Sequence, residues 1–319
     1  MVIRLSGVSC LVALFVCFAP QTAKALSATQ STPICQSTVV GELQTTTFQS
    51  TTFGDTQTLR IWLPPGYNDP ANAQRRYPVL YMMDGENLFD VCTASFHHEW
   101  QIDETLTKLI GDGSIEPLVV VGIDSPGKRR GDEYIPYTDP IFPAPEPHGK
   151  LFPSFLETEV LPLIAREFRV SNDPQHTAIG GSSYGAVAAL YALLRRPDLF
   201  GLGLLESTSL QVGNGQLLSE MSTVAVGPRR VYVGVGTHEM GDDNEKFARE
   251  HGLEGSSFDS GFVHLSEKLA AALQAAALNR PTVLLVKTPG AKHEEKAWAE
   301  RFPAAIQFLF PGHSAASTK

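Results

Sequence analysis

The amino-acid sequence predicts an α/β fold with a mostly parallel central sheet, helices on both faces and antiparallel strands on the N-terminal side. Two early segments, 39–53 and 58–63, alternate like antiparallel strands. Short runs that are apolar on both faces, such as 77–83, then alternate with segments of helical periodicity. Strands first, followed by regular strand and helix alternation, indicate parallel crossovers within one sheet.

The later elements follow the same alternation along the chain. Buried strands are expected at residues 117–123, 176–179, 200–205, 230–235 and 281–287. Helices are expected at residues 102–110, 152–168, 186–195, 262–278 and 298–310. The segment 128–148 is rich in Pro, Tyr, Phe and charge and has no period, so we expect a long irregular insertion. No repeat or linker divides the region, which predicts a single domain over 38–312 and a tail over 313–319.

The N-terminal segment, residues 1–25, has the pattern of a secretory signal peptide. Arg4 supplies the positive start, residues 8–18 are apolar, and Ala23 to Ala25 form an A-x-A cleavage site. The following residues, 26–37, are mostly Ser, Thr and Gln and are expected to be a flexible lead-in. The sequence therefore predicts a periplasmic or secreted protein, cleaved near Ala25.

Charge and hydropathy restrict the partners of the 319-residue chain. Its 25 Lys and Arg and 34 Asp and Glu become a net charge of 23 − 34 = −11 once Arg4 and Lys24 are removed with the signal segment. Such a surface disfavours nucleic acid and anionic membranes. The apolar run at 8–18 is too short for a membrane span and no later run is longer, so no membrane span is expected. The sequence leaves the oligomeric state open.

Two of the four cysteines, Cys35 and Cys92, remain after cleavage of the signal segment. In an oxidising compartment they can form a disulfide, while two buried free thiols are an equal alternative. The adjacent His97 and His98 have no carboxylate or cysteine at zinc-site spacing. We therefore expect no metal and no cofactor.

The most informative stretch, residues 177–186, is an apolar run that breaks into glycines and restarts as an alanine-rich helix. It contains Gly181-Ser182-Ser183-Tyr184-Gly185, which fits G-x-S-x-G, the strand-to-helix turn that exposes a nucleophilic serine. A Cβ at Gly181 or Gly185 would crowd so sharp a turn. Ser183 is the predicted nucleophile, and the alternative is a tight turn whose serines serve only for their size.

A serine nucleophile needs a histidine base, which in this fold follows the nucleophile and the acid along the chain. His293 lies between the last predicted strand and the last predicted helix, where it could reach the sheet edge. His238 and His251 come too early, and His264 lies within a predicted amphipathic helix. We therefore predict His293 as the base and surface or packing roles for the other three.

The acid should lie in the loop after the strand at 230–235, which contains Glu239, Asp242 and Asp243. Glu239 is nearest to the strand end and is preferred, with the two aspartates as competitors. Two backbone N–H groups should stabilise the oxyanion. One is expected from Tyr184, next to the nucleophile, and the other from residues 85–87.

Five motifs occur together in one order along the chain: YPVLYMMDGENLFD, PLVVVGIDSPGKRRGDEYIPY, IGGSSYGA, VGVGTHEMG and KHEEKAW. In this combination the chain resembles the Putative esterase family of α/β hydrolases. That family includes enterochelin and other siderophore esterases, feruloyl esterases, S-formylglutathione hydrolase and antigen 85-type mycolyltransferases. The resemblance covers residues 58–310 and implies the α/β-hydrolase fold.

By position, the resemblance places the family's nucleophile on Ser183, its acid on Glu239 and its base on His293. It places the second oxyanion N–H on Glu86, where the family often has glutamine. This added carboxylate is expected to disfavour strongly anionic substrates. Where family members often carry S-P-S and aromatic residues, this chain has a different segment at 206–211.

Together these observations predict an exported serine esterase that hydrolyses carboxylic esters through an acyl-serine intermediate. The alternatives are an acyltransferase of the antigen 85 type with the same Ser-His-Glu triad, and a non-catalytic binding protein on a hydrolase scaffold. The expected substrate is a small-molecule or glycan-linked ester. Tyr134, Tyr137 and Phe142 in the insertion at 128–148 are expected to line its site.

Overall fold

The computed structural model describes residues 35–139, 147–221, 227–241, 255–275 and 281–312. All the elements below belong to one unit, residues 36–319. The predicted signal peptide (1–25), the tail (313–319) and most of the lead-in (26–37) lie outside the described residues, as do Phe142, Asp242, Asp243 and His251.

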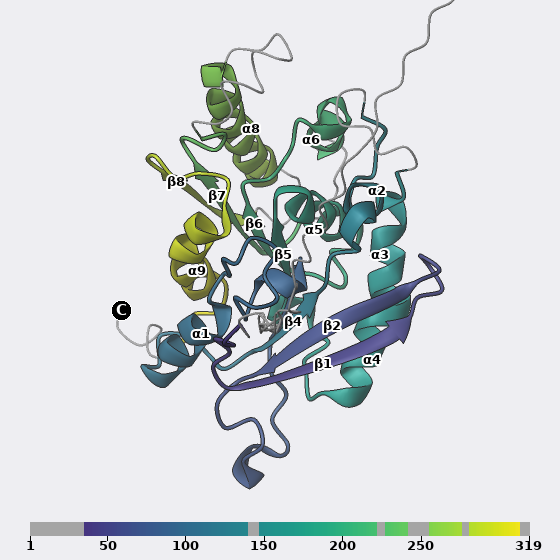
Figure 1. The fold of residues 1–319 in the computed structure, drawn as a ribbon, viewed down its shortest axis with the longest axis vertical. Coiled ribbons are helices and arrows are strands. Elements are labelled where there is room, and N and C mark those ends of the chain that lie inside the picture. The colour runs from purple at the N-terminus through teal and green to yellow at the C-terminus, as the bar shows by residue number, and fades with distance from the viewer. Residues whose placement is uncertain (1–34, 140–146, 222–226, 242–254, 276–280, 313–319) are drawn as a thin grey trace, which may run out of the picture. The chain divides into compact units, whose positions relative to one another are not determined.

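The described part of the chain forms an eight-stranded sheet (Figure 1). Its strands are β1 (Glu42–Gln49), β2 (Thr56–Leu63), β3 (Val79–Met83), β4 (Val119–Ile123), β5 (Thr177–Ser182), β6 (Leu202–Glu206), β7 (Arg230–Gly236) and β8 (Thr282–Thr288). They lie in the order β1-β2-β4-β3-β5-β6-β7-β8. Only the pairs β1–β2 and β2–β4 are antiparallel. The predicted mostly parallel sheet with antiparallel N-terminal strands is confirmed.

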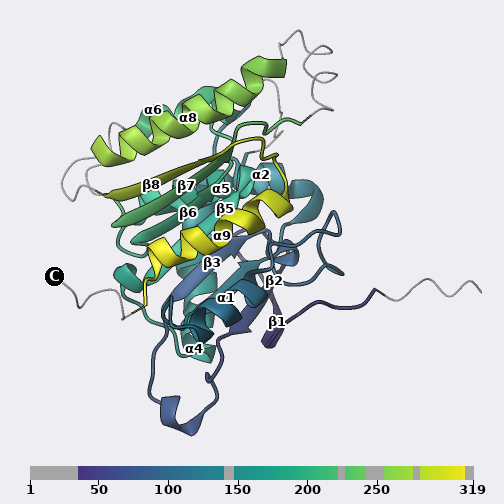
Figure 2. The ribbon, with the colours of Figure 1, turned by 90° about the vertical axis from the view of Figure 1, so that its left-hand side faces the viewer.

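Helices cover both faces of this sheet (Figure 2). They are α1 (Ile102–Gly111), α2 (Arg130–Tyr134), α3 (Phe152–Phe155), α4 (Leu161–Glu167), α5 (Ser183–Arg195), α6 (Gln216–Glu220), α8 (Gly255–Ala275) and α9 (Glu295–Leu309). On one face α1 and α9 pack together and contribute Leu106 and Phe302 to one core. On the other, α3, α5 and α8 share a second core. Among the described residues, no helix combines the length and apolar composition that a membrane crossing requires.

Within the insertion predicted to be irregular at 128–148, the described residues 128–139 are more regular than their composition indicates. A 3₁₀ turn (Gly127–Arg129) runs into the short helix α2. Tyr134 ends this helix, is 1% exposed, and packs edge-on against Phe152 with ring centroids 5.6 Å apart. The lack of a helical period in the sequence reflects the brevity of α2, which makes little more than one turn.

The carboxyl ends of the parallel strands meet at one edge of the sheet, where α/β proteins place their sites. The loops after β3, β5, β6, β7 and β8 all begin there. They carry residues 84–87, Ser183, residues 207–209, Glu239 and His293, respectively. The topology therefore gathers the predicted nucleophile, acid and base at one edge.

Candidate active site

Ser183 occupies a strained turn between β5 and α5. Its φ is +55°, a left-handed conformation that a residue with a Cβ rarely adopts. A Cβ on Gly181 would lie 2.8 Å from the carbonyl carbon of Gly185, and a Cβ on Gly185 would lie 2.9 Å from the Cβ of Met83. Neither position has room for a Cβ: at Gly181 the obstacle is the backbone of Gly185, and at Gly185 it is the side chains of Met83 and Asp84 at the end of β3.

Glu239 and His293 form a close pair beside this turn. Nδ1 of His293 lies 2.7 Å from Oε2 of Glu239, and the backbone N–H of His293 donates to the carbonyl of Glu239 at 3.0 Å. The other carboxylate oxygen, Oε1, accepts hydrogen bonds from the Ser207 hydroxyl at 2.7 Å and from the backbone N–H of Gly236. Glu239 is 2% exposed, so its carboxylate is held almost entirely by protein groups.

These contacts keep Glu239 ionised despite its burial. Burial alone would raise the pKa of Glu239, but the hydrogen bond and the charge of His293, together with the bonds from Ser207 and Gly236, lower that pKa below its usual value. A buried carboxylate with this pKa can hold one tautomer of His293 and stabilise its protonated form.

The serine and the histidine lie in one pocket without a direct hydrogen bond. Among the described residues, Oγ of Ser183 is 3.3 Å from Oγ of Ser209 and makes no hydrogen bond to His293. The imidazole of His293 packs edge-on against Trp298, with ring centroids 5.2 Å apart. It also contacts the tilted ring of Phe262, with ring centroids 5.5 Å apart. In free enzymes catalytic hydrogen bonds are often long and tighten on substrate binding.

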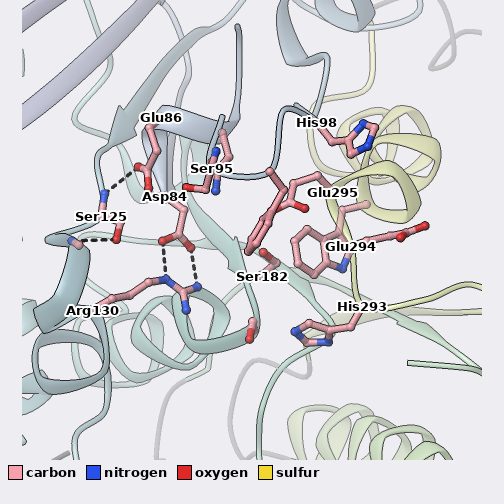
Figure 3. Close-up of a pocket in the computed structure, with 15 residues that line it drawn as sticks. Asp84, Glu86, Ser95, His98, Ser125, Arg130, Ser182, His293, Glu294 and Glu295 are labelled. Atoms are coloured by element: carbon pink, nitrogen blue, oxygen red, sulfur yellow. Dashed lines mark hydrogen bonds and ion pairs between the residues drawn. The ribbon is translucent and has the colours of Figure 1, made fainter. Parts of the chain in front are cut away.

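The pocket that contains Ser183 and His293 has a volume of about 680 Å³ (Figure 3). Asp84 and Arg130 lie on one side of it, and His293 lies with Glu294 and Glu295 on the other. Its volume falls within the range of small-molecule sites. Exposed residues of the loop after β3 complete its mouth, among them Phe96, which is 72% exposed.

Of the residues expected to supply the oxyanion donors, Glu86 lines this pocket, and Tyr184 directly follows the pocket residue Ser183. Glu86 belongs to the 3₁₀ turn Gly85–Asn87, and its carboxylate accepts from the backbone N–H of Ser125 at 2.8 Å. Burial, followed by repulsion from Asp84, raises the pKa of Glu86 to about 7. Tyr184 lies in the first turn of α5, where backbone N–H groups have no partner within the helix.

Arg130 contacts both the loop after β3 and the start of α5. Its Nε and Nη2 donate to the carboxylate of Asp84 at 2.6 and 2.8 Å. Its guanidinium also lies over the Tyr184 ring, 5.5 Å from the centroid. Asp84 has a left-handed φ of +57°, and the chain turns sharply at this residue. Through the ion pair with Asp84 and the ring contact with Tyr184, Arg130 therefore links the loop after β3 to the start of α5.

Tyr134 and Tyr137, which were expected to line the substrate site, do not line the pocket that contains Ser183 and His293. They are 1% and 4% exposed, belong to the core beneath α5, and are absent from the pocket wall. Tyr137 donates its hydroxyl to Glu220 at 2.7 Å and meets Tyr191 edge-on. Aromatic residues in a loop can pack in the core as well as contact a ligand, and the sequence alone does not distinguish these two roles.

The described residues contain no group of three or more His, Cys, Asp or Glu side chains arranged to hold a metal ion. His98 lines the pocket mouth, while His238 pairs with Asp259 at 3.1 Å. Cys35 and Cys92 are both disulfide-bonded. Their pairing with each other stays a prediction, tested below.

Several residues of the site were not singled out by the sequence: Ser207, Ser209, Arg130 and Trp298. The two serines directly follow the buried strand β6 at the same edge as Ser183. That position was a usable signal, because polar residues at the carboxyl ends of parallel strands converge. Arg130 and Trp298 lie on helices, and nothing in their local sequence indicates that they face the pocket.

The fold that positions these residues is the α/β-hydrolase fold. The solved structure of the siderophore hydrolase EstA from Aspergillus nidulans matches it with a TM-score of 0.65 at 20% sequence identity, covering 93% of this chain and 99% of that chain. At this level of identity the likeness shows the fold alone. Residues 50–309 also match the family described as Putative esterase, and the chain belongs to that family. It is therefore a serine hydrolase of the ester-cleaving class.

Two relatives carry named activities. The endo-1,4-beta-xylanase/feruloyl esterase of Xylanibacter ruminicola is 31% identical over 178 residues, which cover 52% of this chain and 21% of that protein. The iron(III) enterobactin esterase of Dickeya dadantii is 31% identical over 163 residues, which cover 50% of this chain and 32% of that protein. The chain thus spans a third or less of the length of these two relatives.

Proposed function

We propose that the protein is an exported serine esterase that cleaves carboxylic esters with Ser183 as nucleophile, His293 as base and Glu239 as acid. The observation that carries the proposal is the 2.7 Å contact between the buried Glu239 and His293, which lines the same pocket as Ser183. The left-handed φ of Ser183 supports it, since backbone strain concentrates at functional sites. Export is supported by the signal-like pattern of residues 1–25.

The proposed reaction begins at His293. Its Nδ1–H makes a hydrogen bond to Glu239 and stays on the ring, and this tautomer has a lone pair on Nε2 that can accept the proton of Ser183. Rotation of the Ser183 side chain away from Ser209 brings Oγ toward that lone pair. Oγ then bonds to the ester carbonyl carbon, and the negative oxygen that forms is stabilised by the backbone N–H groups of Tyr184 and Glu86.

The second half of the reaction regenerates the enzyme. His293 gives its proton to the departing alkoxide, so the alcohol leaves as a neutral molecule and the acyl group stays on Ser183. A water molecule then gives a proton to His293 and bonds to the acyl carbon, which releases the carboxylic acid and restores the serine hydroxyl. In an acyltransferase an alcohol takes the place of this water.

The pocket wall favours uncharged esters with an aromatic acyl group, such as feruloyl esters, over substrates with a net negative charge. Glu294 and Glu295 line the pocket with Glu86, which is ionised above its pKa of about 7, while the guanidinium of Arg130 is already bound by Asp84. Phe96 and Trp298 offer ring surface to an aromatic group. The relative from X. ruminicola is named a feruloyl esterase, which agrees with this proposal.

The test is turnover of a panel of feruloyl, acetyl and siderophore esters by the wild type and by Ser183→Ala. We expect hydrolysis by the wild type, fastest for uncharged aromatic esters, and a loss of at least about a thousandfold in Ser183→Ala. Adding alcohol or sugar acceptors should leave the yield of free acid unchanged. Transfer of the acyl group to the acceptor would indicate an acyltransferase, and binding without turnover would indicate a binding protein.

A further inference from the structure

Ser207, directly after β6, contacts Glu239 from the side opposite to His293. Its hydroxyl donates to Oε1 of Glu239 at 2.7 Å, while Oε2 of Glu239 contacts His293. Ser207 is fully buried and does not line the pocket. We propose that Ser207 is a positioning residue for the acid of the triad: it fixes the carboxylate of Glu239 in the orientation that His293 requires. This inference rests on the proposed function.

The direction of the bond between Ser207 and Glu239 is fixed by two other donors. Nε1 of Trp298 donates to Oγ of Ser207 at 2.9 Å, and Nη2 of Arg301 donates to it at 3.4 Å. An indole N–H and a guanidinium can only donate, so they occupy the lone pairs of the hydroxyl. The one proton of the Ser207 hydroxyl is therefore directed at Glu239, and the orientation of this donor is fixed.

The backbone at Ser207 is strained in a way that serves this contact. Its φ is +44°, which is left-handed and unfavourable for a residue with a Cβ. Consecutive strand residues normally point to opposite faces of a sheet. Here Glu206 and Ser207 both contact Arg301, because the chain turns at Ser207. Strain held in a buried polar residue is typical of a functional position.

The donor Arg301 is itself held in place by Glu206. Nε of Arg301 donates to Oε2 of Glu206 at 2.8 Å, and both side chains are buried. Gly234 on the adjacent strand makes room for this carboxylate, because a Cβ there would lie 2.5 Å from its Cδ. The chain therefore builds a continuous series of contacts from β6 and α9 to the acid and then to the base.

Trp298 links the two ends of this series. Its N–H bonds to Ser207, and its ring meets the imidazole of His293 edge-on at 5.2 Å. One side chain of α9 thus fixes the hydroxyl that orients the acid and also packs against the base. A hydrogen bond that served only stability would not need the same side chain, Trp298, to contact both Ser207 and His293.

The experiment compares Ser207→Ala and Ser207→Gly with the matched control Thr208→Val. Thr208 is the adjacent residue, it is 1% exposed, and in the described structure its hydroxyl has no hydrogen-bond partner. Both Ser207 variants lose the hydroxyl, but glycine tolerates the left-handed φ and alanine does not. With active sites counted by titration, we expect kcat to fall about 10- to 100-fold in both, with KM changed less than about twofold. Thr208→Val should keep kcat within about twofold.

A double-mutant comparison shows whether Ser207 acts through Glu239. In a Glu239→Gln background, Ser207→Ala should lower kcat by less than about twofold further, because the group that it positions is already gone. Losses that multiply in the double variant, or an unchanged kcat in Ser207→Ala, would overturn the inference. In both cases a low kcat for Glu239→Gln alone would leave the proposed function standing. A wild type without esterase activity would instead remove the proposed function and this inference with it.

Discussion

Glu239 and His293 are joined twice, by a side-chain contact of 2.7 Å between Oε2 and Nδ1 and by a backbone hydrogen bond of 3.0 Å. They come from the loops after the neighbouring strands β7 and β8 and are separated by 54 residues. The double connection fixes both the distance and the angle between carboxylate and imidazole. This is the geometry that an acid and base pair needs before substrate arrives.

The first prediction follows from this contact. Glu239→Gln should lower kcat by about a thousandfold or more while the fold is retained, because the amide cannot stabilise the imidazolium and does not hold the same tautomer. The measurement is steady-state kinetics with circular dichroism as the check on folding. The matched control is His238→Gln, since His238 pairs with Asp259 at 3.1 Å in a similar histidine and carboxylate contact. A larger loss in the control than in Glu239→Gln would mean that the wrong pair has been assigned.

The second prediction concerns stability and pH. Burial raises the pKa of Glu86 to about 7, whereas the same group in the unfolded chain titrates near its ordinary pKa of 4.5. The folded state therefore binds the extra proton between these two values. The contribution of Glu86 to stability is fully present below pH 4.5 and is lost as the pH rises through 7.

Glu86→Gln should remove this dependence, because an amide can accept the bond from Ser125 and carries no charge. Relative to the wild type, the variant should gain on the order of 1–3 kcal/mol in free energy of unfolding between pH 4.5 and pH 8. Urea unfolding at the two pH values measures the difference. An equal effect of the substitution at both pH values would contradict it.

The third prediction tests the crowded turn. Gly185→Ala should destabilise the protein by about 1–3 kcal/mol and slow ester cleavage, because the new Cβ would lie 2.9 Å from the Cβ of Met83. Gly111→Ala is the control, since a Cβ at the end of α1 meets nothing within 4 Å. Thermal unfolding of both variants gives the comparison. Equal melting temperatures for the Gly185→Ala and Gly111→Ala variants would show that the turn can accommodate a Cβ at residue 185.

The fourth prediction is that Cys35 and Cys92, both disulfide-bonded, are bonded to each other. In the chain-entropy model, closing a loop of this length stabilises the folded protein by on the order of 4 kcal/mol. Peptide mapping of the unreduced protein should give a linked pair, and reduction should lower the melting temperature. Two thiols that react with iodoacetamide before reduction would exclude the bond.

Much of the fold was predictable, because each buried strand leaves a short apolar run in the sequence. The strands around residues 77–83 and 230–235 were correctly placed to within two residues of β3 and β7. The positions of Ser183, Glu239 and His293 at one edge followed from the G-x-S-x-G motif together with the order of the predicted strands. Helix α2 was missed because it makes little more than one turn, too short to show a period.

Contacts between distant parts of the chain could not be predicted. Ser207 gains its place from a left-handed φ and from two donors on α9, about 90 residues later. Tyr134 and Tyr137 were assigned to the substrate site from their loop context, yet they fill the core. Composition indicates that an aromatic side chain will be buried, but tertiary packing decides whether it lies in the core or in a binding site.

The central claim is that Ser183 is a nucleophile activated by His293, and labelling with a fluorophosphonate tests it most directly. Peptide mapping by mass spectrometry should find about one equivalent of label, on Ser183, and His293→Ala should slow the labelling by orders of magnitude. The nearby Ser182 and Ser209 serve as internal controls and should stay unmodified. Absence of label from the folded wild type, or label on Ser182 or Ser209 instead, would contradict the account.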